Sequence, residues 1–305
     1  MTTSRPLKLV VAINPSASFG KSRAIGPALV QTLRASGHEV TALTEPDFAE
    51  LRDAAHAALR GKPDALVVVG GDGMVSLGVN LLAGTRIPLG IVPSGTGNDM
   101  ARGLGIPVSN TEAAIELLLE ALFLPPRVID AGRITEADGR VTWFASVLSA
   151  GFDAVVNERA NRMRWPRGRS RYNLALLREL AVLKPISYRL TVDGVVTETK
   201  AMLVAAGNNV SLGGGMRLVP DAKLDDGLLD VLVVRPLSRT AFLRIFPRVF
   251  KGTHVTDSRV TIVRARSIRI EADAVVAYAD GERVGPLPID IDVVAAALRV
   301  LAPTP

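Results

Sequence analysis

The stretch Ala65-Leu66-Val67-Val68-Val69-Gly70-Gly71-Asp72-Gly73-Met74 decides the fold of the N-terminal half. Its first five residues are apolar and mostly β-branched, which predicts a buried strand, and a helical pattern begins near Met74. Glycines between a strand and a helix permit positive φ and let an anion approach the backbone N–H groups of the helix N-terminus. A structural turn would use the same residues, so this motif alone leaves both interpretations open.

Alternating strand and helix patterns surround this stretch. Strands are expected at 7–13, 40–43 and 89–92, and helices at 25–33, 48–60 and 113–122. Ser109-Asn110-Thr111-Glu112 fits a capping box before the last of these helices. This alternating order predicts a parallel sheet with helices on both faces.

The pattern changes after Pro125-Pro126, where helices become scarce and strand patterns dominate. Asp193-Gly194 between two strand patterns indicates a hairpin, and residues 169–183 are the one stretch that looks helical. We therefore expect an α/β domain over 1–128 and a mostly antiparallel β domain over 129–292. Residues 293–305 are expected to pack back on the first domain.

Composition narrows the function classes. The 305 residues include no Cys, which excludes disulfides, thiolate nucleophiles and Cys-metal sites. The sequence has no run of 18 apolar residues and no signal-peptide pattern, so a cytoplasmic protein is expected. The net charge of +6 favours an anionic partner, whereas the 4% aromatic content argues against base stacking on nucleic acid.

A second glycine-rich turn, Ser94-Gly95-Thr96-Gly97-Asn98-Asp99, also follows a strand and precedes a helix. Two such turns after neighbouring parallel strands would meet at the carboxyl edge of the sheet, where open α/β sheets bind ligands. Together they predict a nucleotide phosphate site. Neither turn is a Walker A loop or a G-x-G-x-x-G fingerprint. In a third turn, Asn14 can hydrogen-bond a nucleotide. Lys21 of the same turn is either a phosphate partner or a solvated lysine at the start of the helix.

Two acidic segments lie in the second half. Residues 219–230 contain four carboxylates within ten positions, which suits Mg²⁺, although the motif alone favours an ordinary polar turn. Asp280-Gly281-Glu282 follows a strand and is a hairpin turn. Glu282 acts as a general base only if the fold brings it within hydrogen-bond reach of the proton that it removes.

Six separate motifs occur in one order along the chain: Asn14-Pro15, Gly70–Gly73, Gly95–Asp99, Val128-Ile129-Asp130, Leu218–Gly227 and Asp280–Glu282. This set resembles the bacterial diacylglycerol kinase family, lipid kinases related to sphingosine kinases. The Gly-Gly-Asp-Gly turn by itself would also fit NAD kinase. The resemblance implies a Rossmann-like α/β nucleotide domain, a C-terminal β-sandwich, and Mg²⁺-dependent transfer of the γ-phosphoryl group of ATP to a lipid hydroxyl.

The resemblance also implies roles for individual residues. Glu282 is the expected base that accepts the hydroxyl proton. Asp226 is expected to bind a structural Mg²⁺ with the backbone oxygens of Lys223 and Leu228. Asp72, Asp99 and Asp130 are expected to form an acidic, water-linked network near the phosphates. The expected ATP contacts are Asn14, Lys21, Thr44, Gly70, Gly71, Asp72, Gly73, Met74, Ser94, Gly95, Thr96 and Asn98.

Met74 departs from the family pattern, which usually has Thr after the Gly-Gly-Asp-Gly turn, and Ser76 and Leu77 stand where Asn and Glu are usual. A threonine hydroxyl contact to phosphate is thereby lost. This departure keeps open a weakly catalytic nucleotide- or lipid-binding regulator as an alternative to the kinase.

The partners follow from the same resemblance. Diacylglycerol is the expected substrate, with a sphingoid base or a glycolipid as alternatives and no nucleic acid. Six arginines and Trp165 within 159–171 predict peripheral contact with an anionic membrane surface, or a solvated charged loop. A homodimer is left open.

Overall fold

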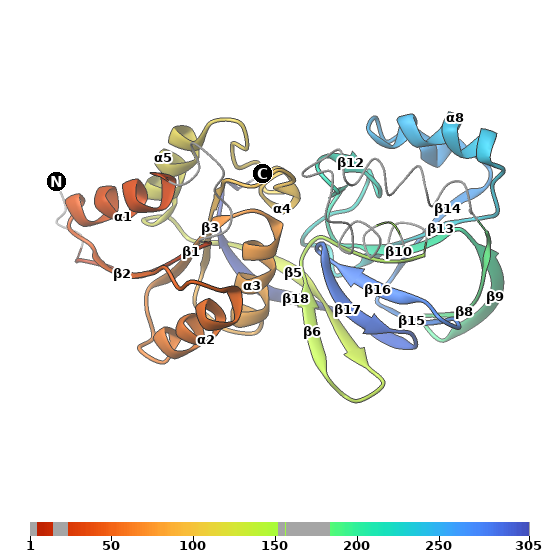
Figure 1. Ribbon diagram of the computed structural model, residues 1–305, viewed down its shortest axis with the longest axis horizontal. Helices are drawn as coiled ribbons and strands as arrows, with labels where there is room; N and C mark the ends of the chain where they lie inside the picture. The colour runs from red at the N-terminus through yellow and green to blue at the C-terminus, as the bar shows by residue number, and fades with distance from the viewer. Residues whose placement is uncertain (1–4, 15–23, 152–155, 157–183, 305) are drawn as a thin grey trace. The chain divides into compact units, whose positions relative to one another are not determined.

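The computed structural model describes residues 5–14, 24–151, 156 and 184–304 (Figure 1). Lys21, the helix expected at 169–183 and the arginine-rich stretch 159–171 lie outside these described residues. The chain forms two compact units, Met1–Ile129 with Ala296–Pro305, and Asp130–Ala295. Among the described residues, no helix has the length and apolar character needed to span a bilayer.

The first unit is built on a parallel sheet. Its order is β2 (Glu39–Leu43), β1 (Lys8–Ile13), β3 (Ala65–Gly70), β4 (Leu89–Pro93) and the C-terminal end of β18 (Ile289–Leu301). All six residues of β3 are buried, as the apolar run predicts for a central strand covered on both faces.

Helices cover both faces of this sheet, which confirms the α/β prediction. Figure 1 shows α1 (Ile25–Ala35) and α5 (Thr111–Ala121) on one side, and α2 (Phe48–Leu59) and α3 (Asp72–Leu82) on the other. A short helix, α4 (Asp99–Gly103), follows β4.

The capping residue of α5 differs by one position from the expected one. The Asn110 side chain accepts a hydrogen bond from the Ala113 N–H at 3.2 Å, so the expectation of a Ser109 cap was wrong. Asn and Ser cap equally well, and the capping residue is the one whose backbone is extended just before the first helical residue.

Alternation along β3 divides the core of this unit between the two faces. Val67 and Val69 pack with Leu29, Leu33 and Leu118 from α1 and α5. On the other face α3 approaches closely, because Gly78 has no side chain and a Cβ there would lie 2.5 Å from Leu89 Cδ1.

The second unit is a sandwich of two antiparallel sheets. One sheet has the order β14 (Val260–Ala265), β13 (Leu229–Val234), β10 (Leu203–Gly207), β7 (Val147–Gly151), β16 (Val276–Ala279) and β17 (Glu282–Pro286). The other contains the start of β18, β15 (Ser267–Glu271), β8 (Ile186–Val192), β9 (Val195–Ala201), β5 (Arg127–Glu136) and β6 (Val141–Phe144). A short pair, β11 (Ser211–Leu212) and β12 (Met216–Arg217), lies apart from both. The predicted β-sandwich is confirmed.

The core of this unit lies between the two sheets, and a helix covers the outer face of the first. Phe144, Leu148 and Val204 belong to the inter-sheet core. Val147 and Leu232, which point the other way along their strands, pack with residues of α8 (Arg239–Val249). This helix, followed by the short 3₁₀ helix η2 (Thr253–Thr256), was not expected from the sequence.

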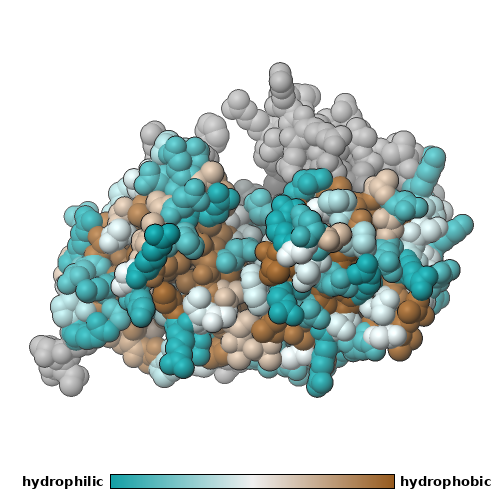
Figure 2. Space-filling model, turned by 90° about the horizontal axis from the view of Figure 1, so that it is seen from below, coloured by the Kyte–Doolittle hydropathy of each residue, from teal (hydrophilic) through white to brown (hydrophobic). Residues whose placement is uncertain are grey.

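The surface mixes polar and apolar residues. On the face shown in Figure 2, hydrophilic side chains are interspersed with hydrophobic ones. Single exposed apolar residues are normal on proteins, so exposure alone does not mark a functional site on this molecule.

Candidate functional site

Two glycine-rich turns and Asn14 lie at the carboxyl edge of the parallel sheet of the first unit. They follow β1, β3 and β4, which are adjacent strands. The Asn14 N–H donates to the Val69 carbonyl at 3.2 Å, and the Ser94 N–H donates to the Gly70 carbonyl at 2.9 Å. These bonds continue the sheet register into the turns, so the strand ends fix the positions of the turns.

The two glycine-rich turns meet backbone to backbone. A Cβ built on Gly95 would lie 2.4 Å from the Gly71 Cα, and one built on Gly71 would lie 3.1 Å from the Gly95 Cα. No real side chain tolerates the first distance without movement of the backbone. Glycine is therefore needed at 95 for the contact between the turns.

Asp72 links the same two turns through its carboxylate. Its Oδ1 accepts the Asp99 N–H at 2.7 Å, and its Oδ2 accepts the Asn98 N–H at 2.9 Å. Burial raises the pKa of Asp72 above its ordinary value, and the nearby Asp99 carboxylate adds to the shift, whereas the two backbone N–H groups oppose it.

Asn98 fixes the shape of the second turn. Its backbone is left-handed, with φ of 54°. Its Oδ1 accepts the Gly95 N–H at 3.1 Å, and its Nδ2 donates to the Gly95 carbonyl at 2.9 Å. Its side chain thus closes the turn, while its backbone N–H bonds to Asp72.

The other expected nucleotide residues differ in exposure. Thr44 and Thr96 are exposed, and Gly73 is half-buried in the first turn of α3. Met74 is buried, its N–H donates to the Gly71 carbonyl at 3.0 Å, and its side chain lies against Gly70. The methionine that replaces the usual threonine thus packs inward against the end of β3.

In the second unit, the acidic loop is organised around two aspartates. Asp130 Oδ2 accepts the Gly227 N–H at 2.7 Å, and the Asp130 N–H donates to the Leu224 carbonyl at 2.7 Å. Asp226 Oδ1 accepts the Leu228 N–H at 3.1 Å. These bonds hold the loop in a defined shape beside the start of β13.

Asp226 Oδ2 gives the loop its capacity for a cation. This oxygen is buried and finds no hydrogen-bond donor among the described residues, although Arg264 Nη2 lies 3.6 Å away. Within the part of the chain that the structure describes, no three His, Asp or Glu side chains group as metal ligands. A Mg²⁺ here would therefore rely on Asp226, backbone oxygens such as those of Lys223 and Leu228, and water, a donor set that suits this hard cation.

The hairpin that carries Glu282 is anchored by its neighbour. Asp280 and Gly281, with φ of 50° and 84°, form the two-residue turn between Ala279 and Glu282, which pair across β16 and β17. The buried Asp280 carboxylate accepts three backbone N–H groups at 2.9–3.0 Å, those of Ala145, Ser146 and Val147. The Asp-Gly pair predicts the turn, but nothing in the sequence signals this second role of Asp280.

Replacing Asp280 with alanine should lower the free energy of unfolding by about 2–4 kcal/mol, because three buried N–H groups lose their acceptor. Asp193→Ala is the matched control, since Asp193 occupies the same position of an Asp-Gly hairpin and accepts the backbone N–H groups of Arg266 and Ser267 but is exposed. Urea unfolding should show that Asp280→Ala lowers the free energy of unfolding by at least 1 kcal/mol more than Asp193→Ala does. Equal losses would contradict the anchoring role.

Glu282 begins β17 with an exposed side chain. The surrounding protein nevertheless displaces part of its water, which raises the pKa of Glu282 above its ordinary value of 4.5. A carboxylate that is both accessible and more basic than usual suits a role in proton transfer.

Comparisons with known proteins identify the family. Residues 8–131 match the diacylglycerol kinase catalytic domain, and residues 146–302 match the YegS C-terminal NAD kinase beta sandwich-like domain. A diacylglycerol kinase of Mycobacterium tuberculosis is 42% identical over 298 residues, covering 97% of this chain and 95% of the relative. The chain belongs to the bacterial diacylglycerol kinase family. It is therefore a lipid kinase.

Further relatives agree with this assignment. A diacylglycerol kinase of Bacillus subtilis is 26% identical over 264 residues, covering 85% of this chain and 84% of the relative. A diacylglycerol kinase structure from Bacillus anthracis shares the fold, with a TM-score of 0.72 at 24% identity over 98% of each chain.

The NAD kinase fold is also related. The NAD kinase of Archaeoglobus fulgidus, solved in complex with ATP, matches with a TM-score of 0.52 at 16% identity, covering 96% of this chain and 93% of that one. The fold alone is thus shared between lipid kinases and NAD kinases. Family membership decides in favour of the lipid kinase.

Proposed function

We propose that this lipid kinase transfers the γ-phosphoryl group of ATP to the hydroxyl of diacylglycerol, forming phosphatidic acid and ADP in a Mg²⁺-dependent reaction. The observation that carries the proposal is the contact between the two glycine turns, locked by Asp72 at the N-terminus of α3. Backbone N–H groups and a helix N-terminus at a sheet edge suit the phosphates of a nucleotide.

The proposed nucleotide contacts are those expected from the sequence. Lys21 is retained only as a prediction, because it lies outside the described residues. The other proposed contacts are Asn14, Thr44, Gly70, Gly71, Asp72, Gly73, Met74, Ser94, Gly95, Thr96 and Asn98. The glycine turns supply backbone groups, so the loss of a hydroxyl at Met74 leaves the main part of the proposed phosphate contact intact.

We propose that Glu282 accepts the proton of the lipid hydroxyl. As it does so, the hydroxyl oxygen attacks the γ-phosphorus, the bond from the γ-phosphorus to the bridging oxygen of the β-phosphate breaks, and ADP leaves. Asp226, with the Lys223 and Leu228 carbonyls, would hold Mg²⁺. When bound near the reaction, Mg²⁺ neutralises phosphate charge. We further propose that Asp72, Asp99 and Asp130 form an acidic network, since Asp72 and Asp99 interact directly and Asp130 shapes the loop of Asp226.

The pH dependence of kcat/KM should report the proposed base. A base must be ionised, and the pKa of Glu282 is raised, so activity should fall as the pH drops through a value above the 4.5 of an ordinary glutamate. The acidic limb of a pH–rate profile, measured at saturating Mg²⁺ over a range where the fold is intact, checks this. An acidic limb at or below pH 4.5 would contradict the assignment.

The second unit contains an apolar cavity between α8 and the outer face of its six-stranded sheet. Its volume is about 90 Å³, and only apolar atoms face its interior. The lining residues are Met202, Leu203, Leu212, Met216, Leu218, Val234, Leu237, Phe242, Ile245, Phe246, Val249, His254 and Val260. Sites that bury small molecules usually span about 300–1,000 Å³, so we propose that this cavity takes part of an acyl chain.

From the sequence alone, apolar residues at 144–152 and 174–183 suit an acyl pocket, or more simply the core, and this cavity lies elsewhere. Phe144 is fully buried in the core between the sheets, and residues 174–183 lie outside the described part of the chain.

Filling the cavity should change acyl-chain preference. Val249→Phe adds volume inside it and should lower kcat/KM for dioleoylglycerol about 10–100-fold relative to dioctanoylglycerol. Val263→Phe is the matched control, because Val263 is exposed on β14. An equal effect on both substrates, or the same effect in the control, would remove the cavity from the lipid site.

Acceptor identity can be tested with purified protein, Mg²⁺, γ-labelled ATP and mixed micelles carrying diacylglycerol, a sphingoid base, a glycolipid or no lipid, with NAD as a soluble acceptor. The proposal expects label in phosphatidic acid at the highest kcat/KM. A higher value for another lipid alcohol would correct the substrate, and ATP binding without any labelled lipid would favour the regulator alternative.

The proposed enzyme works at a bilayer, where diacylglycerol resides. A cytoplasmic location with peripheral association to an anionic surface remains a prediction from the sequence, and a homodimer is left open. The arginine-rich stretch on which membrane contact was expected lies outside the described residues.

A further inference from the structure

Helix α8 presents apolar side chains on two sides. Phe242, Ile245 and Val249 face inward and line the cavity described above. Leu243 and Phe250 face outward and are 56% and 51% exposed. Exposed apolar residues are normal when they occur singly, whereas Leu243 and Phe250 lie on the same side of one helix.

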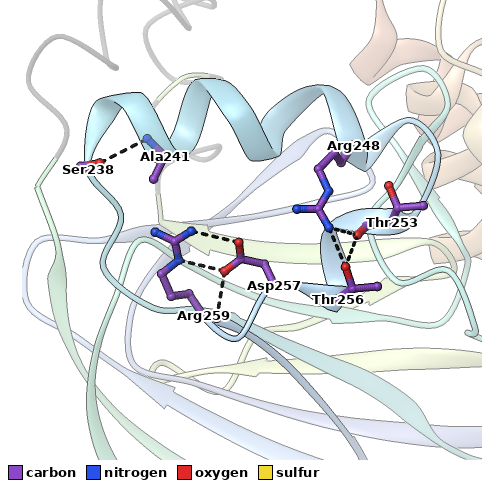
Figure 3. Close-up of polar contacts among 7 residues, drawn as sticks. All are labelled: Ser238, Ala241, Arg248, Thr253, Thr256, Asp257 and Arg259. Carbon is purple, nitrogen blue, oxygen red and sulfur yellow. Dashed lines mark hydrogen bonds and ion pairs between the residues drawn. The ribbon is translucent and has the colours of Figure 1, made fainter.

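The helix is held firmly at both ends (Figure 3). Ser238 caps its N-terminus by accepting the Ala241 N–H at 3.2 Å. The Arg248 guanidinium donates to the Thr253 carbonyl and to Thr256 Oγ1, both at 2.6 Å. The outward face is therefore a pre-formed surface.

The segment after α8 is also tied down. Arg259 Nε and Nη2 donate to the two carboxylate oxygens of Asp257 at 2.8 and 2.9 Å (Figure 3). This paired contact lowers the pKa of Asp257 to about 2. The charge of Asp257 is thus balanced by Arg259, next to the 3₁₀ helix η2 whose residues accept hydrogen bonds from Arg248.

Basic residues flank the outward apolar pair. At about 100° per residue, Leu243, Pro247 and Phe250 fall within a sector of about 60°. Arg239 borders this sector on one side, and Arg244 and Lys251 border it on the other, all of them exposed. The sequence from 231 to 256 contains no Asp or Glu, so this segment of the chain is itself purely basic.

An aromatic row joins the outer surface to the cavity. Phe242 and Phe246 stack with ring centroids 5.4 Å apart, and Phe250 meets Phe246 edge-on at 6.1 Å. Phe242 and Phe246 line the cavity, whereas Phe250 is exposed. The row is a continuous apolar path along one helix.

We propose that the outward face of α8 docks on an anionic lipid bilayer, with Leu243 and Phe250 inserted among the acyl chains and Arg244 and Lys251 at the headgroups. A surface that is apolar at its centre and basic at its rim complements an anionic headgroup layer over hydrocarbon. The choice of a bilayer over a protein partner rests on the proposed lipid function, because the same helix lines the cavity assigned to an acyl chain.

Vesicle sedimentation tests the docking directly. Full-length protein is mixed with vesicles of phosphatidylcholine alone, or of phosphatidylcholine with one third phosphatidylglycerol. Leu243→Ser/Phe250→Ser and Arg244→Glu/Lys251→Glu should each weaken binding to the anionic vesicles at least tenfold. Only the wild-type affinity and that of the serine pair should fall steeply between 0.1 and 0.5 M NaCl.

Matched controls separate α8 from general surface effects. Val195→Ser/Val196→Ser removes two exposed apolar side chains from the β9 hairpin, and Arg60→Glu/Lys62→Glu reverses two exposed charges of the first unit. Both should bind like wild type. Wild-type binding by the α8 variants, or an equal loss in the controls, would overturn the proposal.

Activity measurements separate this inference from the proposed function. The α8 variants should keep wild-type kcat/KM on dispersed dioctanoylglycerol and lose activity only on vesicle-embedded diacylglycerol. A protein that phosphorylates no diacylglycerol but binds anionic vesicles through α8 would refute the proposed substrate and leave the docking surface standing. Loss of self-association in the variants, with vesicle binding intact, would assign the surface to a second copy and overturn the docking proposal.

Discussion

Replacing Glu282 with glutamine should lower kcat about 10²–10⁴-fold, the usual contribution of one well-placed general base. The amide has nearly the same shape as the carboxylate but cannot accept the hydroxyl proton. Because the Glu282 side chain is exposed, the free energy of unfolding should change by less than about 0.5 kcal/mol. Steady-state kinetics on diacylglycerol and urea unfolding give the two values.

Two comparisons sharpen this test. Glu198→Gln neutralises an exposed carboxylate on β9 in the same unit and should retain wild-type kcat. The KM for ATP of Glu282→Gln should stay within about threefold of wild type, because the base is assigned to the chemical step rather than to nucleotide binding. Unimpaired turnover in Glu282→Gln would exclude this residue from the mechanism.

Gly95→Ala should raise the Kd for ATP at least tenfold and lower kcat/KM at least a hundredfold. Its Cβ would lie 2.4 Å from the Gly71 Cα, so the two glycine turns must separate. The separation would also pull Asn98 and Asp99 from the Asp72 carboxylate, which bonds to both backbone N–H groups. Overpacking of this kind costs about 1–3 kcal/mol of stability.

Gly84→Ala is the matched control for Gly95→Ala. Gly84 follows α3 with φ of 78°, and a Cβ there would meet no atom within 4 Å. The control therefore carries backbone strain of about 1 kcal/mol without a clash at the turns. Isothermal titration with a non-hydrolysable ATP analogue compares the two. Equal ATP affinity in Gly95→Ala and wild type would show that the turn contact does not shape the nucleotide site.

The parallel sheet was predictable because its strands are buried on both faces. Val67, Val68 and Val69 form an unbroken apolar run, and such runs bounded by turn residues are typical of central strands. The hairpin at Asp193-Gly194 was also predictable from the sequence, because both residues adopt the positive φ that an Asp-Gly pair favours.

Helix α8 was not expected from the sequence, although Ser238 caps its start and its buried residues recur at helical spacing. Pro247 lies inside it, and proline in a helix interior removes a backbone hydrogen bond. Tertiary contacts offset this cost, since Ile245 and Val249 are buried and the Arg248 side chain bonds to Thr253 beyond the end of the helix.

The site was predictable in its residue types and only partly in its contacts. Turns after neighbouring parallel strands were expected to meet, and Gly71 and Gly95 do meet. The link through Asp72 depends on a left-handed residue at Asn98, which no local pattern indicates. The triple anchor of Asp280 joins residues more than 130 positions apart, and such contacts arise only from the packing of the sandwich.

The most direct test of the account is a single-turnover measurement of phosphoryl transfer from γ-labelled ATP to dioleoylglycerol in mixed micelles with Mg²⁺. Asp226→Ala and Glu282→Gln run in parallel with wild type. The account expects labelled phosphatidic acid from wild type, with the rate at least a hundredfold lower in Glu282→Gln and strongly reduced in Asp226→Ala. Phosphatidic acid formed equally by all three proteins, or by none of them despite measurable ATP binding, would contradict it.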